Sequence, residues 1–139
     1  MYIVISGGGK IAQALTQNLL ADGHDVAVIE KREGVAEKLL QATDNQALVI
    51  VGDGCDKRYQ GDAGMSRADV FVAATGDDDD NLVACQLARI AFGVPRAISR
   101  VNNPKNQGIF SKLGIEAICA TLIISRMISE EATLTELLD

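Results

Sequence analysis

A glycine-rich turn between two strand-like segments constrains this chain more than any other feature. The apolar, β-branched run at 2–6 (YIVIS) leads directly into GGGKIA at 7–12, which fits G-x-G-x-x-[GA], and a helical pattern follows. A second strand-like run at 25–30 (DVAVIE) ends in an acid about 20 residues after the turn. This order of strand, turn, helix, strand and acid predicts a dinucleotide-binding βαβ unit.

The residues of the turn have separate predicted roles in holding a diphosphate. Gly7 permits the sharp turn that leaves the strand, and a side chain at Gly9 would stand where the phosphates approach. Ala12 is small enough for the helix to pack close to the sheet. Amide groups at the helix start, with the helix dipole, would then face the phosphates. The alternative is a glycine-rich turn that binds no ligand.

The acid at the end of the second strand predicts which nucleotide fits. Glu30 would accept hydrogen bonds from the 2′ and 3′ hydroxyl groups of a ribose, and it would repel a 2′-phosphate. Lys31 and Arg32 follow at once and could soften that repulsion. We therefore expect NAD(H) or an adenine nucleotide such as ATP or ADP rather than NADP. Glu30 suits any ribose with free hydroxyl groups, so it does not choose between NAD(H) and ATP/ADP.

Composition narrows the class of protein. The 139 residues suit one domain, and the 47% hydrophobic content with only 4% aromatic residues suits a parallel sheet covered by helices. A net charge of −6 disfavours nucleic acid as a partner. Cys55, Cys85 and Cys119 show neither zinc nor CxxC spacing, which favours free thiols in the cytoplasm. We expect no signal peptide and no direct insertion into a membrane.

Strand-like and helix-like segments alternate along the whole chain. Expected strands lie at 2–6, 25–30, 47–51, 69–74, 96–101 and 115–119, and expected helices at 10–21, 34–42, 57–63, 81–92, 106–113 and 121–138. We predict an α/β, doubly wound, six-stranded parallel sheet of the Rossmann type in the order 3-2-1-4-5-6. Residues 1–139 form one domain in this prediction, and its crevice lies between 7–12 and 74–76. No chain is left over for a substrate domain.

Several other residues would lie beside this crevice. Thr75 and Gly76 follow the fourth strand and either line the ligand or form a helix-entry turn. Asp53 either contacts the base or ribose or only bridges its own turn. Lys10 is either a phosphate contact or a solvated lysine, and Arg100 could pair with a phosphate or with a carboxylate of a neighbouring subunit.

The acidic run at 77–80 precedes the fourth helix. We interpret it as an N-cap with first-turn charges that complement the helix dipole. A divalent-cation site is the alternative, although consecutive residues point in different directions. His24 is the only histidine and falls in a turn on the far side of the sheet, so no catalytic group is expected.

The last helix carries too many apolar residues for one core-facing stripe. They are Leu122, Ile123, Ile124, Met127, Ile128, Leu134, Leu137 and Leu138. We expect an exposed apolar face that packs on another copy of the chain, with a possible bend at 130–133. A simple cover helix is the alternative.

Five segments carry a resemblance to a known family. They are YIVISGGGKIA at 2–12, GDGCD at 52–56, DAGMSRADVFVAATGDDDDNLVACQLAR at 62–89, SRVNNP at 99–104 and FSKLGIEAICA at 110–120. With these segments, the chain resembles the N-terminal domain of Trk-type potassium-uptake regulatory proteins, also called the RCK or KTN domain. The family's usual C-terminal ligand-binding domain is missing, so the chain is either a fragment or a stand-alone domain.

The resemblance implies a cytoplasmic regulator that binds NAD(H) or ATP/ADP and controls a potassium channel or transporter. It also implies a homodimer or a larger ring, held at the membrane through a partner, with the last helix as a crossover helix between subunits. The cofactor-binding residues expected in this chain are Gly7, Gly9, Lys10, Ile11, Ala12, Glu30, Lys31, Asp53, Cys55, Thr75, Gly76 and Arg100. Two other functions stay open: a small NAD-dependent oxidoreductase of the sirohaem-synthase type, and a structural subunit with an empty crevice.

Overall fold

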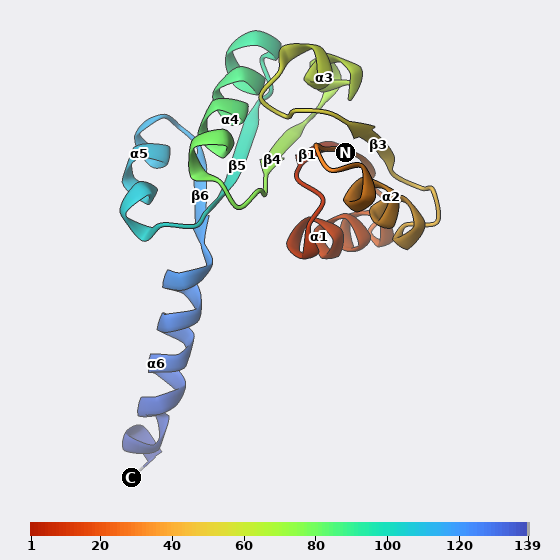
Figure 1. Cartoon of the computed structure of the whole chain (residues 1–139). Coiled ribbons are helices and arrows are strands. Elements are labelled where there is room, and N and C mark those ends of the chain that lie inside the picture. Colours follow the sequence, from red (N-terminus) through yellow and green to blue (C-terminus); the bar gives the residue numbers. More distant parts are fainter. Residues whose placement is uncertain (139) are drawn as a thin grey trace.

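Six parallel strands form one sheet in the computed structural model, which describes residues 1–138, with side chains through residue 134 (Figure 1). The strands are β1 (Tyr2–Ser6), β2 (Asp25–Glu30), β3 (Leu48–Val51), β4 (Val70–Ala73), β5 (Arg96–Val101) and β6 (Glu116–Cys119). Their order is β3-β2-β1-β4-β5-β6, and every neighbouring pair is parallel. The predicted fold class and strand order are confirmed.

Helices connect the strands. The α-helices are α1 (Lys10–Ala21), α2 (Glu33–Ala42), α3 (Lys57–Asp62), α4 (Asp78–Phe92), α5 (Gln107–Lys112) and α6 (Ala120–Leu138). Two short 3₁₀ helices, η1 (Met65–Arg67) and η2 (Pro104–Asn106), were not predicted. The helix α4 begins three residues earlier than predicted because the Asp77 side chain accepts a hydrogen bond from the Asp80 amide and caps it.

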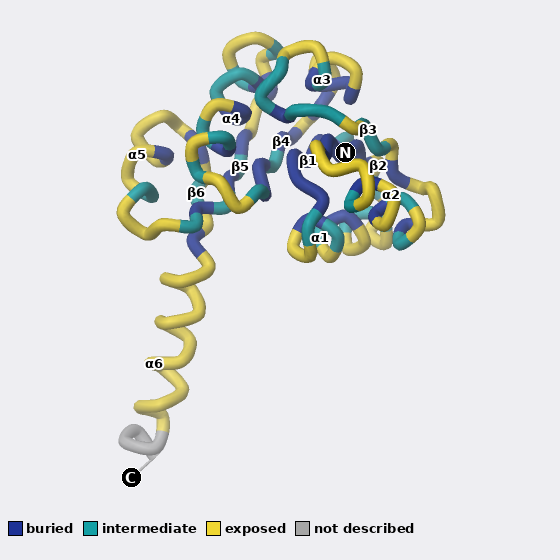
Figure 2. The backbone as a smooth tube through the Cα atoms, in the orientation of Figure 1, coloured by how far each residue is buried: buried dark blue, intermediate teal, exposed yellow. Residues whose placement is uncertain are grey.

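The alternating side chains of the strands build two apolar layers. Ile3 and Ile5 of β1 pack with Ala12 and Leu39 on the face covered by α1 and α2. Val4, between them, points to the opposite face, which is covered by α3, α4 and α5. Figure 2 shows the central strand β1 buried, whereas the edge strand β3 is partly exposed and most of the remaining exposed surface lies on helices and loops. Because both faces are covered, the carboxyl edge of the sheet is where a ligand can approach.

The direction of winding reverses between β1 and β4. These two strands are neighbours in the sheet, but the chain leaves them toward opposite sides, into α1 and α4. Gly7 follows β1 with φ of +109°, a conformation that side chains rarely adopt. A Cβ atom there would also lie 3.2 Å from the Ala74 carbonyl group after β4. The glycine therefore lets the two strand ends meet at the crevice.

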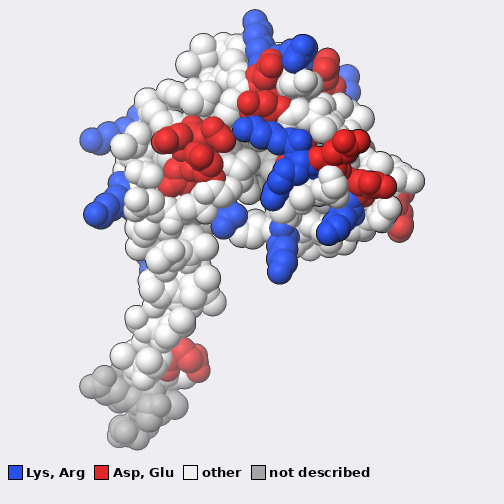
Figure 3. Space-filling view, in the orientation of Figure 1, with Lys and Arg blue, Asp and Glu red and all other residues white. Residues whose placement is uncertain are grey.

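The last helix extends away from the sheet. It follows β6 directly, and it is one continuous helix through residues 130–133, where a bend was expected (Figure 1). Apolar side chains on it are exposed: Leu122, Ile123, Ile124, Met127, Ile128 and Leu134. The side chains of Leu137 and Leu138 lie outside the described residues, as does Asp139. Figure 3 shows few charged groups on the visible face of most of α6.

No described helix is both long enough and apolar enough to cross a membrane.

Candidate functional site: a cavity at the strand-order reversal

A cavity of about 380 Å³ opens at the carboxyl edge where β1 and β4 meet. The predicted residues that line it are Gly7, Gly9, Glu30, Lys31, Asp53, Cys55, Thr75, Gly76 and Arg100. They come from both halves of the sheet and from segments as far apart as β2 and β5. Topology brings them together, because parallel strands end at one edge and the winding reverses there.

Three predicted residues lie at the start of α1 and do not line this cavity with the rest. Ala12 is fully buried between α1 and the sheet, where its small side chain permits close packing. Lys10 and Ile11 are exposed. The first bond within α1 runs from the Gln13 amide to the Gly9 carbonyl, so the amides before Gln13 lack partners within the helix.

Gly9 borders free space at the start of α1. A Cβ atom built on Gly9 would meet no other atom within 4 Å, although Gly9 itself lines the cavity. The backbone there needs no glycine for its own conformation, since φ is −71°. The free space beside Gly9 therefore fits the close approach of a ligand.

Glu30 is the most constrained charged group of the cavity. Its side chain is only 5% exposed. One carboxylate oxygen, Oε1, accepts hydrogen bonds from the Gly8 amide (3.0 Å) and from Nη2 of Arg32 (2.9 Å). The other, Oε2, accepts from the Arg32 amide (2.7 Å) and from Nε of Arg32 (3.3 Å). Burial alone would raise the pKa of Glu30, but these hydrogen bonds and the Arg32 charge hold its pKa below the ordinary value.

Lys31 forms ion pairs with carboxylates from both sides of the cavity. Its Nζ lies 3.8 Å from Asp53 Oδ2 and 3.7 Å from Asp80 Oδ2. Asp53 follows β3, whereas Asp80 lies in the first turn of α4. Asp53 also accepts a hydrogen bond from the Cys55 amide (2.8 Å), so it bridges its own turn and lines the cavity at once.

The Cys55 thiol lies in the cavity wall and stays protonated at neutral pH. Burial, and then the charges of Asp53 and Asp80, raise its pKa to about 11. Its Sγ donates toward the Asp80 carbonyl oxygen at 3.2 Å. A protonated thiol is a poor nucleophile, so this position contributes packing and a weak hydrogen bond rather than covalent chemistry.

A buried asparagine that the sequence did not single out fixes the α4 side of the cavity. Asn81 is 1% exposed, and its Nδ2 donates to the carbonyl oxygens of Thr75 and Arg100, both at 3.0 Å. Its Oδ1 accepts from the Thr75 amide. Asn81 therefore ties the loop after β4 to the end of β5. In the sequence, Asn81 is a polar residue at the same helical spacing as the apolar residues Ala84, Cys85 and Ala88, and this position could have indicated a buried polar contact.

The acidic run divides into separate structural roles. Asp77 caps α4, and Asp80 faces Lys31. Asp78 accepts hydrogen bonds from the amides of Asn102 (2.7 Å) and Asn103 (2.9 Å) and from the side chains of Asn102 and Asn106. Figure 3 shows acidic side chains gathered at this end of α4. Among the described residues, no group of three or more acidic, histidine or cysteine side chains is placed to hold a metal ion.

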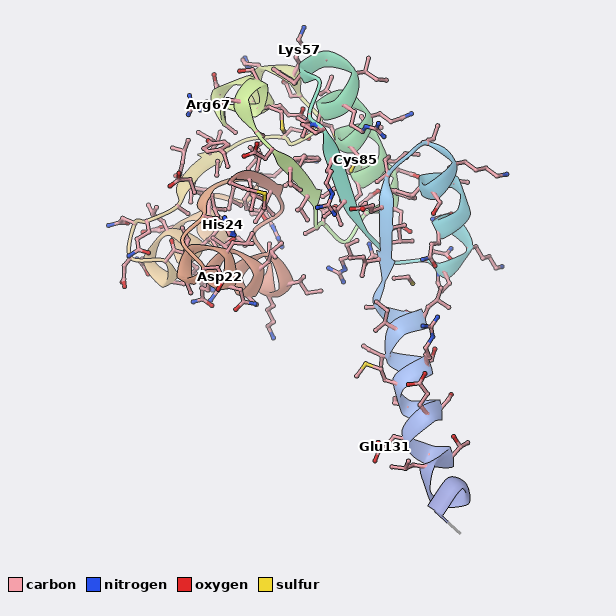
Figure 4. The ribbon with its side chains drawn as sticks, turned by 180° about the vertical axis from the view of Figure 1, so that it is seen from behind. Asp22, His24, Lys57, Arg67, Cys85 and Glu131 are labelled. Carbon is pink, nitrogen blue, oxygen red and sulfur yellow. The ribbon has the colours of Figure 1, made fainter. Side chains whose placement is uncertain are left out.

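Other cavity residues were missed because their role depends on where strands end. Ser6 ends β1, Ile29 is the residue before the end of β2, Gly52 and Gly54 lie in the turn after β3, and Arg32, Asp77 and Asp80 are charged. Ala74 also lines the cavity and belongs to the segment 74–76 where the crevice was predicted. The predicted strand order placed these ends together, so the order was the usable signal. His24 lies away from them, in the turn before β2, where Nδ1 is 3.0 Å from the chain's amino group (Figure 4).

Comparisons with known proteins identify the family of this chain and agree with its fold. The family model described as "TrkA-N domain" matches residues 3–121. A Trk system potassium uptake protein TrkA homolog of Methanothermobacter thermautotrophicus is 44% identical over 118 residues, covering 85% of this chain and 53% of that protein. The Mycobacterium tuberculosis Trk system potassium uptake protein TrkA is 32% identical over 139 residues, covering 99% of this chain and 62% of that protein.

Solved structures share the fold at lower identity. The Kef CTD of Shewanella denitrificans in an AMP-bound form has a TM-score of 0.81 at 21% identity, covering all of this chain and 83% of that one. The GsuK channel bound to NAD has a TM-score of 0.73 at 20% identity, covering 84% of this chain and 21% of that one. The chain thus spans between half and two thirds of the two curated relatives described above. By the match over residues 3–121, the chain belongs to the TrkA-N domain family.

Proposed function

We propose that this chain is a regulatory module that binds NAD(H) or ATP/ADP at the β1–β4 crevice and controls a potassium channel or transporter. Family membership supports the potassium-transport role, because the relatives are named as Trk potassium uptake proteins. Two solved structures with this fold are described as bound to NAD and to AMP. The module acts in the cytoplasm and reaches the membrane through a partner.

The observation that carries the nucleotide proposal is that Gly9 and Glu30 line the same cavity. Gly9 leaves room for a diphosphate beside the start of α1, where amides and the helix dipole favour negative charge. Glu30 ends β2 as a buried carboxylate that could accept ribose hydroxyl groups. The two residues suit the ribose and the diphosphate of an adenosine diphosphate moiety, which NAD(H), ADP and ATP share.

A ligand in this cavity would couple to the conformation of the sheet. One wall comes from the ends of β2 and β3, and the other from the loop after β4 and from Arg100 of β5. A ligand between these walls would contact both halves of the sheet. The Lys31 ammonium group lies near Asp53 on one wall and Asp80 on the other. When a ligand binds, this side chain would turn from the two carboxylates toward the phosphates. Ligand exchange therefore changes the relative position of the halves, and this change is the regulatory signal.

The site supports binding more than chemistry. The Cys55 thiol has its pKa raised to about 11, so it is protonated at neutral pH and lacks the reactivity of a catalytic nucleophile. His24 lies in the turn before β2, apart from the cavity. A regulatory role needs only differential affinity for two conformations, which this cavity can supply.

Calorimetry tests the nucleotide proposal. We expect NAD⁺, NADH, ADP or ATP to bind, and Glu30→Ala to weaken that binding by about 1–3 kcal/mol, because ribose hydroxyl groups lose a buried acceptor. Glu37→Ala removes an exposed acid of α2 and is the matched control. If none of these nucleotides binds at millimolar concentration, the crevice is not a nucleotide site and the proposal fails.

Uptake measurements test the regulatory role. Cells that lack the gene for the whole protein should take up rubidium, a potassium analogue, at a changed rate. The native gene should restore the rate, and a gene carrying Glu30→Ala should not. Restoration by the Glu30→Ala gene would show that nucleotide binding at this cavity does not control transport.

A further inference from the structure

The Glu30 carboxylate has no acceptor position left for a ribose in this structure. A carboxylate offers about four lone-pair positions for hydrogen bonds. Four donors reach Glu30: the amides of Gly8 and Arg32, and Nε and Nη2 of the Arg32 side chain. A sugar that binds Glu30 must therefore replace some of these donors.

The four donors differ in how easily they can leave. The Gly8 amide lies in the turn after β1, and a Cβ on Gly8 would lie 3.1 Å from the Glu30 side chain, so backbone and carboxylate are closely packed. The Arg32 amide precedes α2, and its position is fixed by the chain. The Arg32 side chain, in contrast, is 66% exposed and can turn into water without opening a cavity in the core.

The guanidinium group occupies the carboxylate in the same way that a ribose would. It presents two N–H donors, one to each Glu30 oxygen, at 3.3 and 2.9 Å. The 2′ and 3′ hydroxyl groups of a ribose also present two donors on adjacent atoms. Since a carboxylate has a fixed number of acceptor positions, the two groups compete for the same pair.

We propose that Arg32 is a specificity-determining residue of the nucleotide site, a latch whose guanidinium group takes the place of the ribose on Glu30 until a ligand displaces it. This inference rests on the proposed function. The backbone amides of Gly8 and Arg32 keep Glu30 ionised and oriented while the latch is open. Only a ligand with free 2′ and 3′ hydroxyl groups replaces both side-chain bonds that opening breaks.

The Arg32 side chain also affects how strongly the site would bind a nucleotide that carries a 2′-phosphate. With the guanidinium present, a positive charge stands beside the sugar-binding carboxylate and offsets its repulsion of a phosphate. Without it, Glu30 faces the phosphate alone. Removing the Arg32 side chain should therefore raise the affinity for NAD⁺ and lower the affinity for NADP⁺.

Calorimetric titration of AMP, NAD⁺ and NADP⁺ tests this on the whole chain. We expect Arg32→Ala to bind AMP and NAD⁺ about threefold to tenfold more tightly than the unchanged protein, because the competing donor is gone. The NAD⁺-to-NADP⁺ affinity ratio should rise. The melting temperature without ligand should stay the same or fall, so tighter binding cannot be a consequence of a more stable fold.

Arg58→Ala is the matched control. Arg58 is 68% exposed, pairs with Asp56 at 3.6 Å, and does not line the cavity. Its loss changes the net charge equally and should leave all three affinities unchanged. A shift equal to that of Arg32→Ala would assign the effect to net charge and overturn the latch.

The outcomes separate the two proposals. If the unchanged protein binds AMP or NAD⁺ and Arg32→Ala binds them equally or more weakly, Arg32 is not a latch, while the nucleotide site stands. If neither protein binds any of the three at millimolar concentration, the nucleotide site itself fails, and the latch fails with it. If Arg32→Ala binds AMP and NAD⁺ more tightly and Arg58→Ala does not, the result supports both the nucleotide site and the latch.

Discussion

Two neighbouring glycines of the opening turn meet different physical demands. Gly7 has a positive φ and faces the Ala74 backbone, whereas Gly9 has an ordinary φ and faces open space. The fold requires a glycine at position 7, whereas at position 9 we propose that the glycine leaves room for a bound ligand. Substitutions at the two positions should therefore have opposite profiles of stability and binding.

At Gly7, we expect Gly7→Ala to destabilise the protein by about 1–3 kcal/mol, because a Cβ is strained at this φ and crowds the Ala74 carbonyl. Urea unfolding measures the change. Gly34→Ala is the control, since Gly34 lies in α2 with open space around it and should keep or slightly raise stability. Equal stability of both variants would show that the turn can relax.

At Gly9, we expect Gly9→Asp to fold with a melting temperature close to that of the unchanged protein. Aspartate is a favoured N-cap, and a Cβ there meets nothing within 4 Å. Nucleotide affinity should fall at least about tenfold, because a side chain and a negative charge then occupy the phosphate position. Unchanged affinity by calorimetry would place the phosphates elsewhere.

At the scale of single elements, Asp78 links the first turn of α4 to the connection after β5 by hydrogen bonds. It accepts four hydrogen bonds from Asn102, Asn103 and Asn106. Burial opposes its ionisation, but these bonds outweigh burial and lower the pKa of Asp78 from its ordinary value of 3.8. The same connection lines a second pocket, which shares Gly76 and Asp77 with the cavity described above.

We expect Asp78→Asn to lower the free energy of unfolding at pH 7 by about 1–3 kcal/mol, because an amide cannot accept all of these bonds. Since the folded pKa is depressed, the stabilisation is present above pH 3.8 and is lost as the pH falls through the lower folded pKa. Urea unfolding at pH 7 and near pH 3 should show a smaller acid loss in Asp78→Asn. Asp79→Asn, at the exposed neighbour, should behave like the unchanged protein.

Helices and strands could be predicted where the sequence pattern that determines them lies within the segment itself. The β-branched runs of β1, β2 and β4 gave the strands, and the glycine turn with the acid gave the order of winding. The early start of α4 was missed because it depends on the Asp77 cap. Residues 130–133 break the apolar pattern of α6 but stay helical, because acidic residues and alanine suit an exposed helix.

Contacts between elements were less predictable. The Arg32 pair with Glu30 requires knowing how a side chain folds back over the end of its own strand. The Asn81 bridge requires two strand ends and one helix face to meet. Neither follows from spacing along the chain. Nine of the predicted cofactor residues nevertheless line one cavity, because the strand order alone places strand ends together.

At the scale of the whole molecule, α6 carries the exposed apolar surface that the sequence had indicated. Ile124, Met127 and Ile128 are each more than half exposed. Monomeric proteins rarely leave contiguous apolar patches of this kind uncovered. We expect the chain to form a homodimer or a larger ring through this helix.

Light scattering at tens of micromolar measures this. We expect the unchanged chain to be at least dimeric and Ile124→Glu with Ile128→Glu to be monomeric, because charges then occupy the apolar face. The double variant should unfold at about the same temperature at low concentration, since these side chains are exposed within one chain. As a control, Ser125→Glu with Ser129→Glu adds the same charge on α6. A monomeric unchanged chain would contradict the expectation.

The direct passage from β6 into α6 has a mechanical consequence. With 19 residues, α6 is about 28 Å long, and no loop separates it from the last strand of the sheet. A rotation of that strand by roughly 10° would carry the far tip of such a rod by roughly 5 Å. A small rotation of this edge strand of the sheet would thus displace the far end of α6 by a distance comparable to the pitch of one helical turn.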